Sequence, residues 1–508
     1  MDKPKQIRSA LISVYYKDRV DSIVQKLHEL GIKLYSTGGT YDFIKSLGIP
    51  ATTVESLTSY PSVFGGRVKT LHPSIFGGIL YRRDNPEDTK QLEEYNIPPI
   101  DLVIVDLYPF EATLASGADD EAVIEKIDIG GISLIRAAAK NFSDVVIIAS
   151  STQYDNLIKL LDEKDGITTL ADRRHLAAQA FNVSSHYDTA IFNYFNSDGR
   201  IDSFKQSEQG GQVLRYGENP HQQSVFYGES SKVFDQLHGK ALSYNNLVDL
   251  DAGIALINEF SVPTFAILKH TNACGLASRL NLLQAWNEAL AGDPVSAFGG
   301  VLITNTIVDE LTAIEINKLF FEIILAPDYE KKARELLQSR KNRIILRKKS
   351  FDFQAKQFKS LLNGVIEQDK DSRTESAADL HNVTLRVADE NEIKDLLFAN
   401  KIVKHTKSNA IVLVKNQQLI GCGVGQTSRV DALKQAITKA GEFGFDLHGA
   451  VMASDAFFPF ADSVEIACKA GITAVIQPGG SVKDNDSVTY CDNNNMSMVF
   501  TGIRHFKH

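Results

Sequence analysis

The chain has 508 residues, and its 54 lysines and arginines against 63 aspartates and glutamates give a formal net charge of −9. That length exceeds what one hydrophobic core normally supports, so we expect more than one domain. The hydrophobic share of 43% and the charged share of 23% are ordinary for a globular protein. The acidic balance argues against a nucleic-acid partner that would be held by a broad basic face.

The four cysteines lie far apart, and no two of them form a Cys-x-x-Cys pair. A disulfide framework or a cysteine-rich zinc site is therefore not expected, and the cytoplasm is the expected compartment. The first apolar run, residues 10–14, is too short for a signal-peptide core or a membrane span, so no membrane partner is expected.

The first part of the chain alternates strand and helix patterns. A buried strand is expected at 10–14, a helix from about 20 to 30, a strand at 32–35 and a helix over about 41–47. This order is typical of a parallel, doubly wound sheet. The glycine loop 36–40 precedes the second helix, where free N–H groups would suit a phosphate, although a simple turn is the alternative.

Polar residues then follow at the ends of several expected elements. The irregular segment 65–73 is rich in basic and imidazole side chains, and such a loop is costly to order unless it binds something. A strand is expected at 102–106 and a helix at 134–140. Tyr108, Asp128 and Lys140 can converge on one cleft, or they can be an ordinary buried tyrosine, helix-flanking aspartate and surface lysine.

A second candidate centre lies at Lys269 and His270, where a short apolar run ends. We expect a strand buried on both faces, and in open α/β sheets chemistry collects beyond the carboxyl ends of such strands. An ammonium beside an imidazole disfavours protonation of the imidazole, so His270 can act as a base while Lys269 faces developing negative charge. A solvated lysine beside a histidine that caps the strand is the alternative.

A series of motifs runs in a fixed order over essentially the whole chain. Those at 36–40, 66–73, 107–110, 128–131 and 137–141 resemble the IMP cyclohydrolase domain of the bifunctional AICAR formyltransferase/IMP cyclohydrolase family. Those at 215–222, 242–246, 269–272, 296–300, 407–410, 425–429, 454–460, 477–480 and 504–508 resemble the formyltransferase domain of the same family.

The resemblance implies an α/β protein of two parts. The first, 1–200, is similar to a methylglyoxal-synthase-like doubly wound domain with its core at about 1–148. A linker at 201–212 follows, in a stretch whose serine, glycine and glutamine content favours a linker by composition alone. The formyltransferase domain at 213–508 would consist of two tandem cytidine-deaminase-like subdomains, divided near 331–352 or 369–376.

The function that the resemblance implies is the last two steps of IMP synthesis. A formyl group would pass from 10-formyltetrahydrofolate to AICAR, and the formyl-AICAR formed would close to IMP with loss of water. The folate would be a co-substrate, with no tightly bound cofactor and no metal, and the protein a cytoplasmic homodimer. The alternatives are a single-function AICAR formyltransferase and a nucleotide-binding protein with a degenerate cyclohydrolase site.

The resemblance also assigns residues to both reactions. In formyl transfer, the catalytic residues would be Lys269, His270 and Asn409, and the substrate-binding residues Arg215, Tyr216, Asn246, Arg429, Phe457, Asp462 and His508. In ring closure, the catalytic residues would be Lys69, Tyr108, Asp128 and Lys140, and the nucleotide-binding residues Ser13, Lys17, Ser36, Thr37, Gly38, Thr40, Arg67 and Thr70.

Three positions in the first part of the chain depart from the family pattern. Tyr15 and Tyr16 replace a serine and an aspartate, and Asp106 stands where asparagine is more common. A carboxylate that faces an anionic nucleotide costs affinity unless it is paired or turned away. The second part lacks the His-x-Glu and Pro-Cys-x-x-Cys signatures of the zinc deaminases, so no zinc is expected there.

Overall fold

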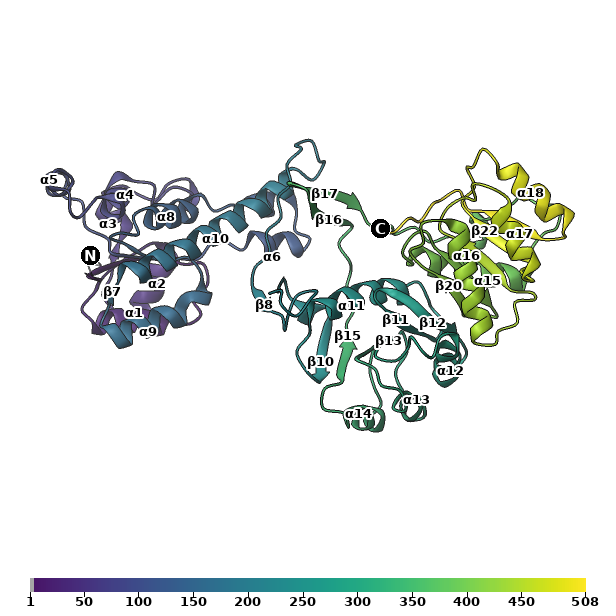
Figure 1. Ribbon diagram of the computed structural model, residues 1–508. Coiled ribbons are helices and arrows are strands. Elements are labelled where there is room, and N and C mark those ends of the chain that lie inside the picture. The colour runs from purple at the N-terminus through teal and green to yellow at the C-terminus, as the bar shows by residue number, and fades with distance from the viewer. Residues whose placement is uncertain (1–3) are drawn as a thin grey trace. The chain divides into compact units, whose positions relative to one another are not determined.

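The computed structural model describes residues 4–508, and the chain divides into two compact units, Met1–Gln209 and Gly210–His508 (Figure 1). Each unit has its own central sheet and its own buried cores. The division between Gln209 and Gly210 falls inside the stretch 201–212 that the sequence assigns to a linker.

A five-stranded sheet in the order β4-β3-β2-β5-β6 forms the centre of unit 1, and all its pairings are parallel. Its strands are β2 (Ser9–Ser13), β3 (Lys33–Ser36), β4 (Thr52–Thr53), β5 (Leu102–Val105) and β6 (Val146–Ile148). A separate antiparallel pair joins β1 (Lys5–Gln6) to β7 (Ile167–Thr168). The doubly wound parallel sheet expected from the sequence is therefore confirmed.

Helices connect these strands. They are α1 (Val20–Glu29), α2 (Gly38–Ser46), α3 (Val54–Thr58), η1 (Phe64–Gly66), α4 (Pro73–Leu80), α5 (Pro86–Glu94), α6 (Phe110–Ala115), α7 (Asp120–Ile124), α8 (Ile129–Lys140), η2 (Ser151–Gln153), α9 (Tyr154–Lys164) and α10 (Leu170–Phe195). Helix α8 begins five residues before the expected 134, because the Asp128 side chain caps its first turn by accepting the Gly131 N–H.

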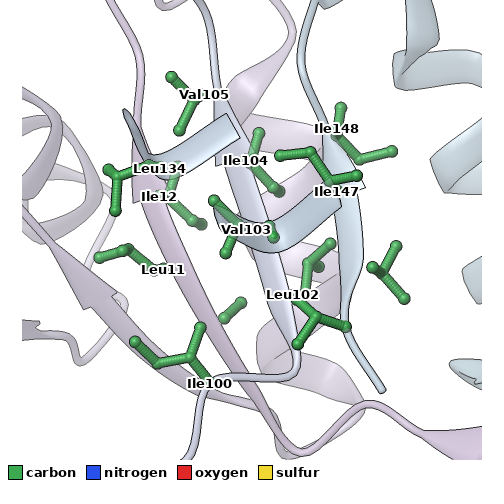
Figure 2. Close-up of a cluster of buried hydrophobic side chains, with 14 of the residues drawn as sticks. Leu11, Ile12, Ile100, Leu102, Val103, Ile104, Val105, Leu134, Ile147 and Ile148 are labelled. Carbon is green, nitrogen blue, oxygen red and sulfur yellow. The ribbon is translucent and has the colours of Figure 1, made fainter. Parts of the chain in front are cut away.

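The core of unit 1 is aliphatic. Figure 2 shows side chains of β2, β5 and β6 packed together with Leu134 from α8. The β5 residues Leu102–Val105 are all buried, as expected for a parallel strand covered on both faces. Burying one such side chain contributes about 1.5–3 kcal/mol, so this cluster stabilises the strands from which the loops at the sheet edge begin.

A second sheet, of twelve strands, runs through unit 2 in the order β10-β15-β14-β13-β11-β12-β20-β19-β21-β22-β23-β18. Its first six strands in sequence are β10 (Phe234–His238), β11 (Thr264–Lys269), β12 (Asn272–Ser278), β13 (Val301–Thr304), β14 (Ile323–Ala326) and β15 (Ile344–Lys348). The other six are β18 (His381–Asn382), β19 (Ile411–Lys415), β20 (Gln418–Gly423), β21 (Val451–Ser454), β22 (Ala474–Gln477) and β23 (Ser497–Phe500).

The two halves of this sheet repeat one topology. In each half a hairpin, β11–β12 or β19–β20, pairs antiparallel with a third strand, two parallel strands follow, and an antiparallel edge strand completes the set. The halves join where β12 pairs with β20. This internal repeat agrees with the tandem subdomains that the sequence resemblance implies.

The helices of unit 2 are η3 (Ser230–Lys232), α11 (Tyr244–Ile257), α12 (Leu282–Gly292), α13 (Glu310–Ile316), α14 (Lys331–Leu337), η4 (Ala377–Asp379), α15 (Glu390–Lys404), α16 (Arg429–Glu442), α17 (Asp462–Lys469) and α18 (Asp484–Asn493). Two small hairpins complete the unit: β8 (Gly211–Val213) with β9 (Val225–Tyr227), and β16 (Lys356–Leu361) with β17 (Gly364–Asp369).

The strand expected at the apolar run before His270 is β11, and its residues Thr264–Leu268 are buried, as expected. β11 runs antiparallel to both β12 and β13. The pairing with β12 follows from the turn between the two strands, because His270 and Thr271 have φ of 49° and 69° and close a two-residue hairpin. Turns of this type normally use Asn-Gly, and a β-branched threonine at positive φ costs free energy.

In residues 4–508, no helix has the length and apolar character that a membrane crossing requires. Over the same residues, no group of three or more histidine, cysteine, aspartate or glutamate side chains is arranged to hold a metal ion. The four cysteines are free thiols.

Candidate active sites

The first candidate site lies in unit 1 at the carboxyl edge of the parallel sheet. The loop after β2, the start of α2 after β3, and the segment after β5 all begin at this edge. Ligands bind at this edge in open α/β sheets. The loop that contains Lys69 and the start of α8 complete the site, as the following contacts show.

Hydroxyl groups fix the loop after β2 to the start of α2. The buried Thr40 hydroxyl accepts the Val14 N–H at 3.2 Å and donates to the Val14 carbonyl at 3.0 Å. The Ser36 hydroxyl, also buried, donates to the Ile12 carbonyl at 2.8 Å. Ser36 and Thr40 are therefore scaffold residues, rather than groups that face a ligand.

Two features remain at this position: a hydroxyl pair, in which Thr37 is itself buried, and the helix start. Ser13 Oγ and Thr37 Oγ1 lie 3.1 Å apart. Helix α2 begins at Gly38, so the first N–H groups of a nine-residue helix point out of it beside these hydroxyls. This arrangement suits an anionic group such as a phosphate.

Two lysines bring positive charge to the same place. The Lys69 ammonium lies 3.8 Å from where a Cβ on Gly38 would stand. Burial lowers the pKa of Lys17, the charge of Asp106 opposes this shift, and the nearby Lys69 adds to it. Lys17 also donates hydrogen bonds to the carbonyls of Val14 and Tyr15.

Asp128 is the candidate acid–base group of this site. Burial raises the pKa of its carboxyl group, against hydrogen bonds from the Gly131 and Tyr108 N–H groups and the charge of Lys69. Burial and then the charge of Asp128 raise the pKa of Tyr108. Thr70 Oγ1 lies 3.0 Å from where a Cβ on Gly130 would stand, beside the start of α8. Lys69, Thr70, Tyr108 and Asp128 thus converge.

A residue that the sequence interpretation missed supports Asp128 from α10. The Tyr187 hydroxyl accepts the Asp128 N–H at 2.9 Å and donates to the Lys126 carbonyl at 2.6 Å. Burial raises the pKa of Tyr187 to about 12, so it stays protonated. Fifty-nine positions separate Tyr187 from Asp128, and nothing in the local sequence signals the contact.

The unusual Asp106 and Tyr15 have defined partners. The Asp106 carboxylate accepts hydrogen bonds from the N–H groups of Tyr15 and Tyr16, the latter at 3.1 Å. It is therefore paired, which is the condition for a carboxylate near an anionic nucleotide. Burial nonetheless raises its pKa. The Tyr15 ring packs edge-on against Tyr108 with centroids 5.5 Å apart, and the Lys126 ammonium lies 5.2 Å from the Tyr15 ring. Tyr15 therefore adds an aromatic wall to the site.

The structure does not bring every predicted residue to this cluster. Lys140 is exposed at the last position of α8, whereas Asp128 caps the first turn of the same helix. Twelve residues of helix correspond to about 18 Å along the axis, which is beyond the reach of a lysine side chain. Arg67 is exposed and pairs with Glu125.

The second candidate site lies in unit 2 at the tip of the β11–β12 hairpin. The Lys269 ammonium donates to the Phe298 carbonyl at 2.8 Å. The Asn272 amide donates to the His270 carbonyl at 2.8 Å. The ammonium and the imidazole thus stand on consecutive residues at the end of a buried strand, as the sequence predicts.

Asp249 on α11 holds this hairpin turn and is a second residue that the sequence interpretation missed. Its carboxylate accepts the Thr271 N–H at 2.8 Å. Burial raises the pKa of Asp249, against the Thr271 hydrogen bond and the charges of His270 and Lys269. This carboxylate therefore stabilises the left-handed turn and acts electrostatically on both candidate catalytic groups.

The other half of unit 2 brings Asn409 towards the hairpin. The Lys407 N–H donates to the Asn272 side-chain oxygen at 2.9 Å, which joins the two loops. Asn409 Oδ1 accepts from the Arg429 guanidinium at 2.9 Å. Arg429 itself is buried and pairs with Asp455, so it orients Asn409 and is not free to face a ligand.

The other predicted residues of unit 2 differ in their contacts and in their exposure to solvent. Arg215 donates to the Tyr216 hydroxyl at 2.7 Å and lies 3.8 Å from Glu322. Asn246 is only 3% exposed because its side chain closes the N-terminal capping box of α11, a structural role. Phe457, Asp462 and His508 are exposed and available to a ligand.

A cavity of about 270 Å³ adjoins Lys269 and His270. Its walls come from both halves of unit 2, with Asp293 and Ser296 on one side and Gln435 and Lys439 on the other. The candidate formyl-transfer groups therefore lie where the two repeats meet.

Comparisons with known proteins identify the family. The family model described as "AICARFT/IMPCHase bienzyme" matches residues 138–439, and that of the "MGS-like domain" matches residues 19–133. A "Bifunctional purine biosynthesis protein PurH" from Bacteroides thetaiotaomicron is 62% identical over 508 residues, covering all of both chains. A protein of the same name from Aquifex aeolicus is 46% identical over 510 residues, covering 98% of this chain and all of the other. A solved chain titled "Crystal structure of ForH" is 34% identical and covers 38% of this chain and 98% of that one, with a TM-score of 0.34.

Proposed function

The chain belongs to the AICARFT/IMPCHase bienzyme family, and we propose that unit 2 carries the formyl transfer and unit 1 the ring closure. The enzyme is bifunctional: it forms formyl-AICAR from AICAR and closes it to IMP, the last two steps of IMP synthesis. The observation that carries the proposed division is that each unit has its own pairing of an ammonium with an acid–base group. These are Lys69 with Asp128, and Lys269 with His270.

In formyl transfer, the amine of AICAR attacks the formyl carbon of 10-formyltetrahydrofolate. The new C–N bond leaves a negative charge on the formyl oxygen, and the Lys269 ammonium stabilises that charge. His270 takes the proton from the attacking amine. The bond from the formyl carbon to the folate nitrogen then breaks, and His270 returns the proton to that nitrogen. Asn409, oriented by Arg429, hydrogen bonds at the transfer centre.

In ring closure, the carboxamide nitrogen of formyl-AICAR attacks the formyl carbon and a water molecule leaves. The departing oxygen takes one proton from each of the two nitrogens, so proton transfer is needed but no net acid. A buried Asp128 with a raised pKa suits this exchange because it can both accept and give a proton. Lys69 stabilises the charge on the formyl oxygen, and Tyr108 bounds the reacting atoms.

Substrate binding uses the neighbouring groups. In unit 1, the nucleotide phosphate binds at the start of α2 beside Gly38, with Ser13, Thr37 and Lys17 around it. In unit 2, Arg215 and Tyr216 bind the AICAR nucleotide with His508, while Phe457 and Asp462 contact the folate. The folate is a co-substrate, and no step needs a tightly bound cofactor or a metal.

We further propose that the protein is a cytoplasmic homodimer whose formyl-transfer sites are shared between subunits. The sequence resemblance supports the dimer, and four free cysteines suit a reducing compartment. Dilution that separates the subunits should then lower formyl transfer per mole of protein, and unchanged activity in the separated subunits would contradict the shared site.

The experiment that tests the proposed function uses the wild-type chain with two substrate mixtures. AICAR with 10-formyltetrahydrofolate should give IMP, followed by ultraviolet absorbance, and formyl-AICAR alone should give IMP without folate. If IMP forms from formyl-AICAR but not from AICAR with 10-formyltetrahydrofolate, the protein is a cyclohydrolase without formyl transfer. Formyl-AICAR that accumulates from the first mixture would leave a formyltransferase without ring closure.

A further inference from the structure

The loop between α12 and β13 is closed by the side chain of Asp293. This residue follows the last residue of α12 and is 6% exposed. Its carboxylate accepts the Ser296 N–H at 2.8 Å and the Ser296 hydroxyl at 2.7 Å, and its carbonyl accepts the Ala297 N–H at 3.1 Å. Asp293 thus fixes the first turn of loop 293–299.

The far end of the same loop holds the catalytic lysine. The Phe298 carbonyl accepts one of the three N–H donors of the Lys269 ammonium, and the Gly299 N–H donates to the Phe320 carbonyl at 2.7 Å. Gly299 has φ of 69°, and a Cβ there would lie 3.3 Å from the Lys269 ammonium. The position of this loop therefore sets the position of the ammonium.

Lys439 anchors Asp293 from the other half of the sheet. Its ammonium on α16 lies 2.6 Å from Asp293 Oδ2. Burial acts to raise the pKa of Asp293, but hydrogen bonds from Lys439 and Ser296 outweigh it and the pKa is lowered, so the carboxylate is charged. The ion pair lies in the wall of the cavity that Lys269 and His270 also line.

Stability alone does not account for this pair. The Lys439 side chain is 35% exposed, and ion pairs of that exposure contribute about 0–1 kcal/mol. Its effect on the position of the loop matters more. Without Lys439, the buried carboxylate of Asp293 loses its counter-charge beside the cavity that Lys269 and His270 line. Loop 293–299 is hydrogen bonded to the Asp293 side chain at one end and to the Lys269 ammonium at the other. A movement of Asp293 is therefore transmitted to the ammonium.

We infer that the Asp293–Lys439 ion pair is a positioning pair for formyl transfer. It locks loop 293–299 so that the Phe298 carbonyl holds the Lys269 ammonium in place, and it makes this geometry depend on the contact between the two halves of unit 2. The inference rests on the proposed role of Lys269. It also gives a physical role to the motif at 296–300.

The test compares Lys439→Met with the conservative Lys439→Arg and with Lys434→Met. Lys434 is exposed on the same helix, so it is a matched control. A displacement of about 1 Å costs about a hundredfold in rate. We therefore expect Lys439→Met to lower kcat for formyl transfer by roughly 10- to 100-fold, with the KM for AICAR within about 3-fold. Ring closure of formyl-AICAR reports on the integrity of unit 1, and the fluorescence of the buried Trp286 reports on that of unit 2.

The expected result includes rescue to within about 5-fold of wild type by Lys439→Arg, and no loss in Lys434→Met. A kcat for Lys439→Met equal to that of wild type would overturn the inference. So would a change in KM alone, or a fall in kcat for Lys439→Arg as large as that for Lys439→Met. If Lys439→Met does not fold, the isosteric Asp293→Asn takes its place and must show the same loss in kcat. Wild-type protein without formyl transfer would instead refute the proposed function.

Discussion

Replacing His505 tests how a buried imidazole stabilises unit 2. The His505 side chain is 2% exposed, with Nδ1 2.6 Å from Asp371 Oδ2 and Nε2 3.1 Å from Glu375 Oε1. Burial alone would lower the pKa of His505, but hydrogen bonds to Asp371 and Glu375 outweigh it and raise the pKa from 6.5 to about 9. A rise of this size corresponds to about 3 kcal/mol of stabilisation by the protonated form.

The sign of the pH dependence follows from that rise. Because the folded-state pKa lies above the unfolded value, the stabilisation is complete below pH 6.5 and is lost as pH rises through about 9. The free energy of unfolding of wild type minus that of His505→Gln should therefore be about 3 kcal/mol larger at pH 6 than at pH 10. His381→Gln, which removes an exposed histidine of unit 2, is the matched control for the loss of an imidazole.

Urea unfolding followed by the fluorescence of Trp286 measures this difference. Trp286 is the single tryptophan of the chain and is buried in unit 2, so its signal reports on that unit. A difference in unfolding free energy between wild type and His505→Gln that is equal at pH 6 and pH 10 would show that protonated His505 does not stabilise the fold.

Three further predictions concern the candidate sites. Asp249→Asn should lower kcat for formyl transfer about tenfold and leave ring closure intact, because the His270 turn loses a charge-assisted hydrogen bond; equal rates would contradict this role. Gly299→Ala should lower formyl transfer because a side chain at φ of 69° is strained and crowds Lys269, whereas Gly444→Ala, a similar glycine with open space around it, should not. Asp128→Asn should reduce ring closure at least about tenfold more than Lys140→Ala, since α8 holds these residues at opposite ends; equal losses would contradict a site formed by one chain.

Much of unit 1 could be predicted because its signals are local. The apolar runs at 10–14 and 102–106 are the buried strands β2 and β5, and the apolar spacing after Val20 is helix α1. The start of α8 was harder, because Gly130 and Gly131 in its first turn hide the helical pattern.

What the sequence could not supply depends on contacts between distant residues. The hairpin after β11 closes through His270 and Thr271, which are not typical turn residues, so its antiparallel pairing was not predicted. Tyr187 supports Asp128 across 59 positions, and Lys439 reaches Asp293 across 146. Such pairs follow from the packing of whole elements and have no local signature.

The most direct test of the central claim uses two reciprocal variants of the full chain. Lys269→Met should abolish formyl transfer and still convert formyl-AICAR to IMP at the wild-type rate. Asp128→Asn should do the reverse, so that AICAR and 10-formyltetrahydrofolate give formyl-AICAR that accumulates. We expect these two losses to be separable. Loss of both activities in either variant, with the protein folded, would contradict the division of the two reactions between the units.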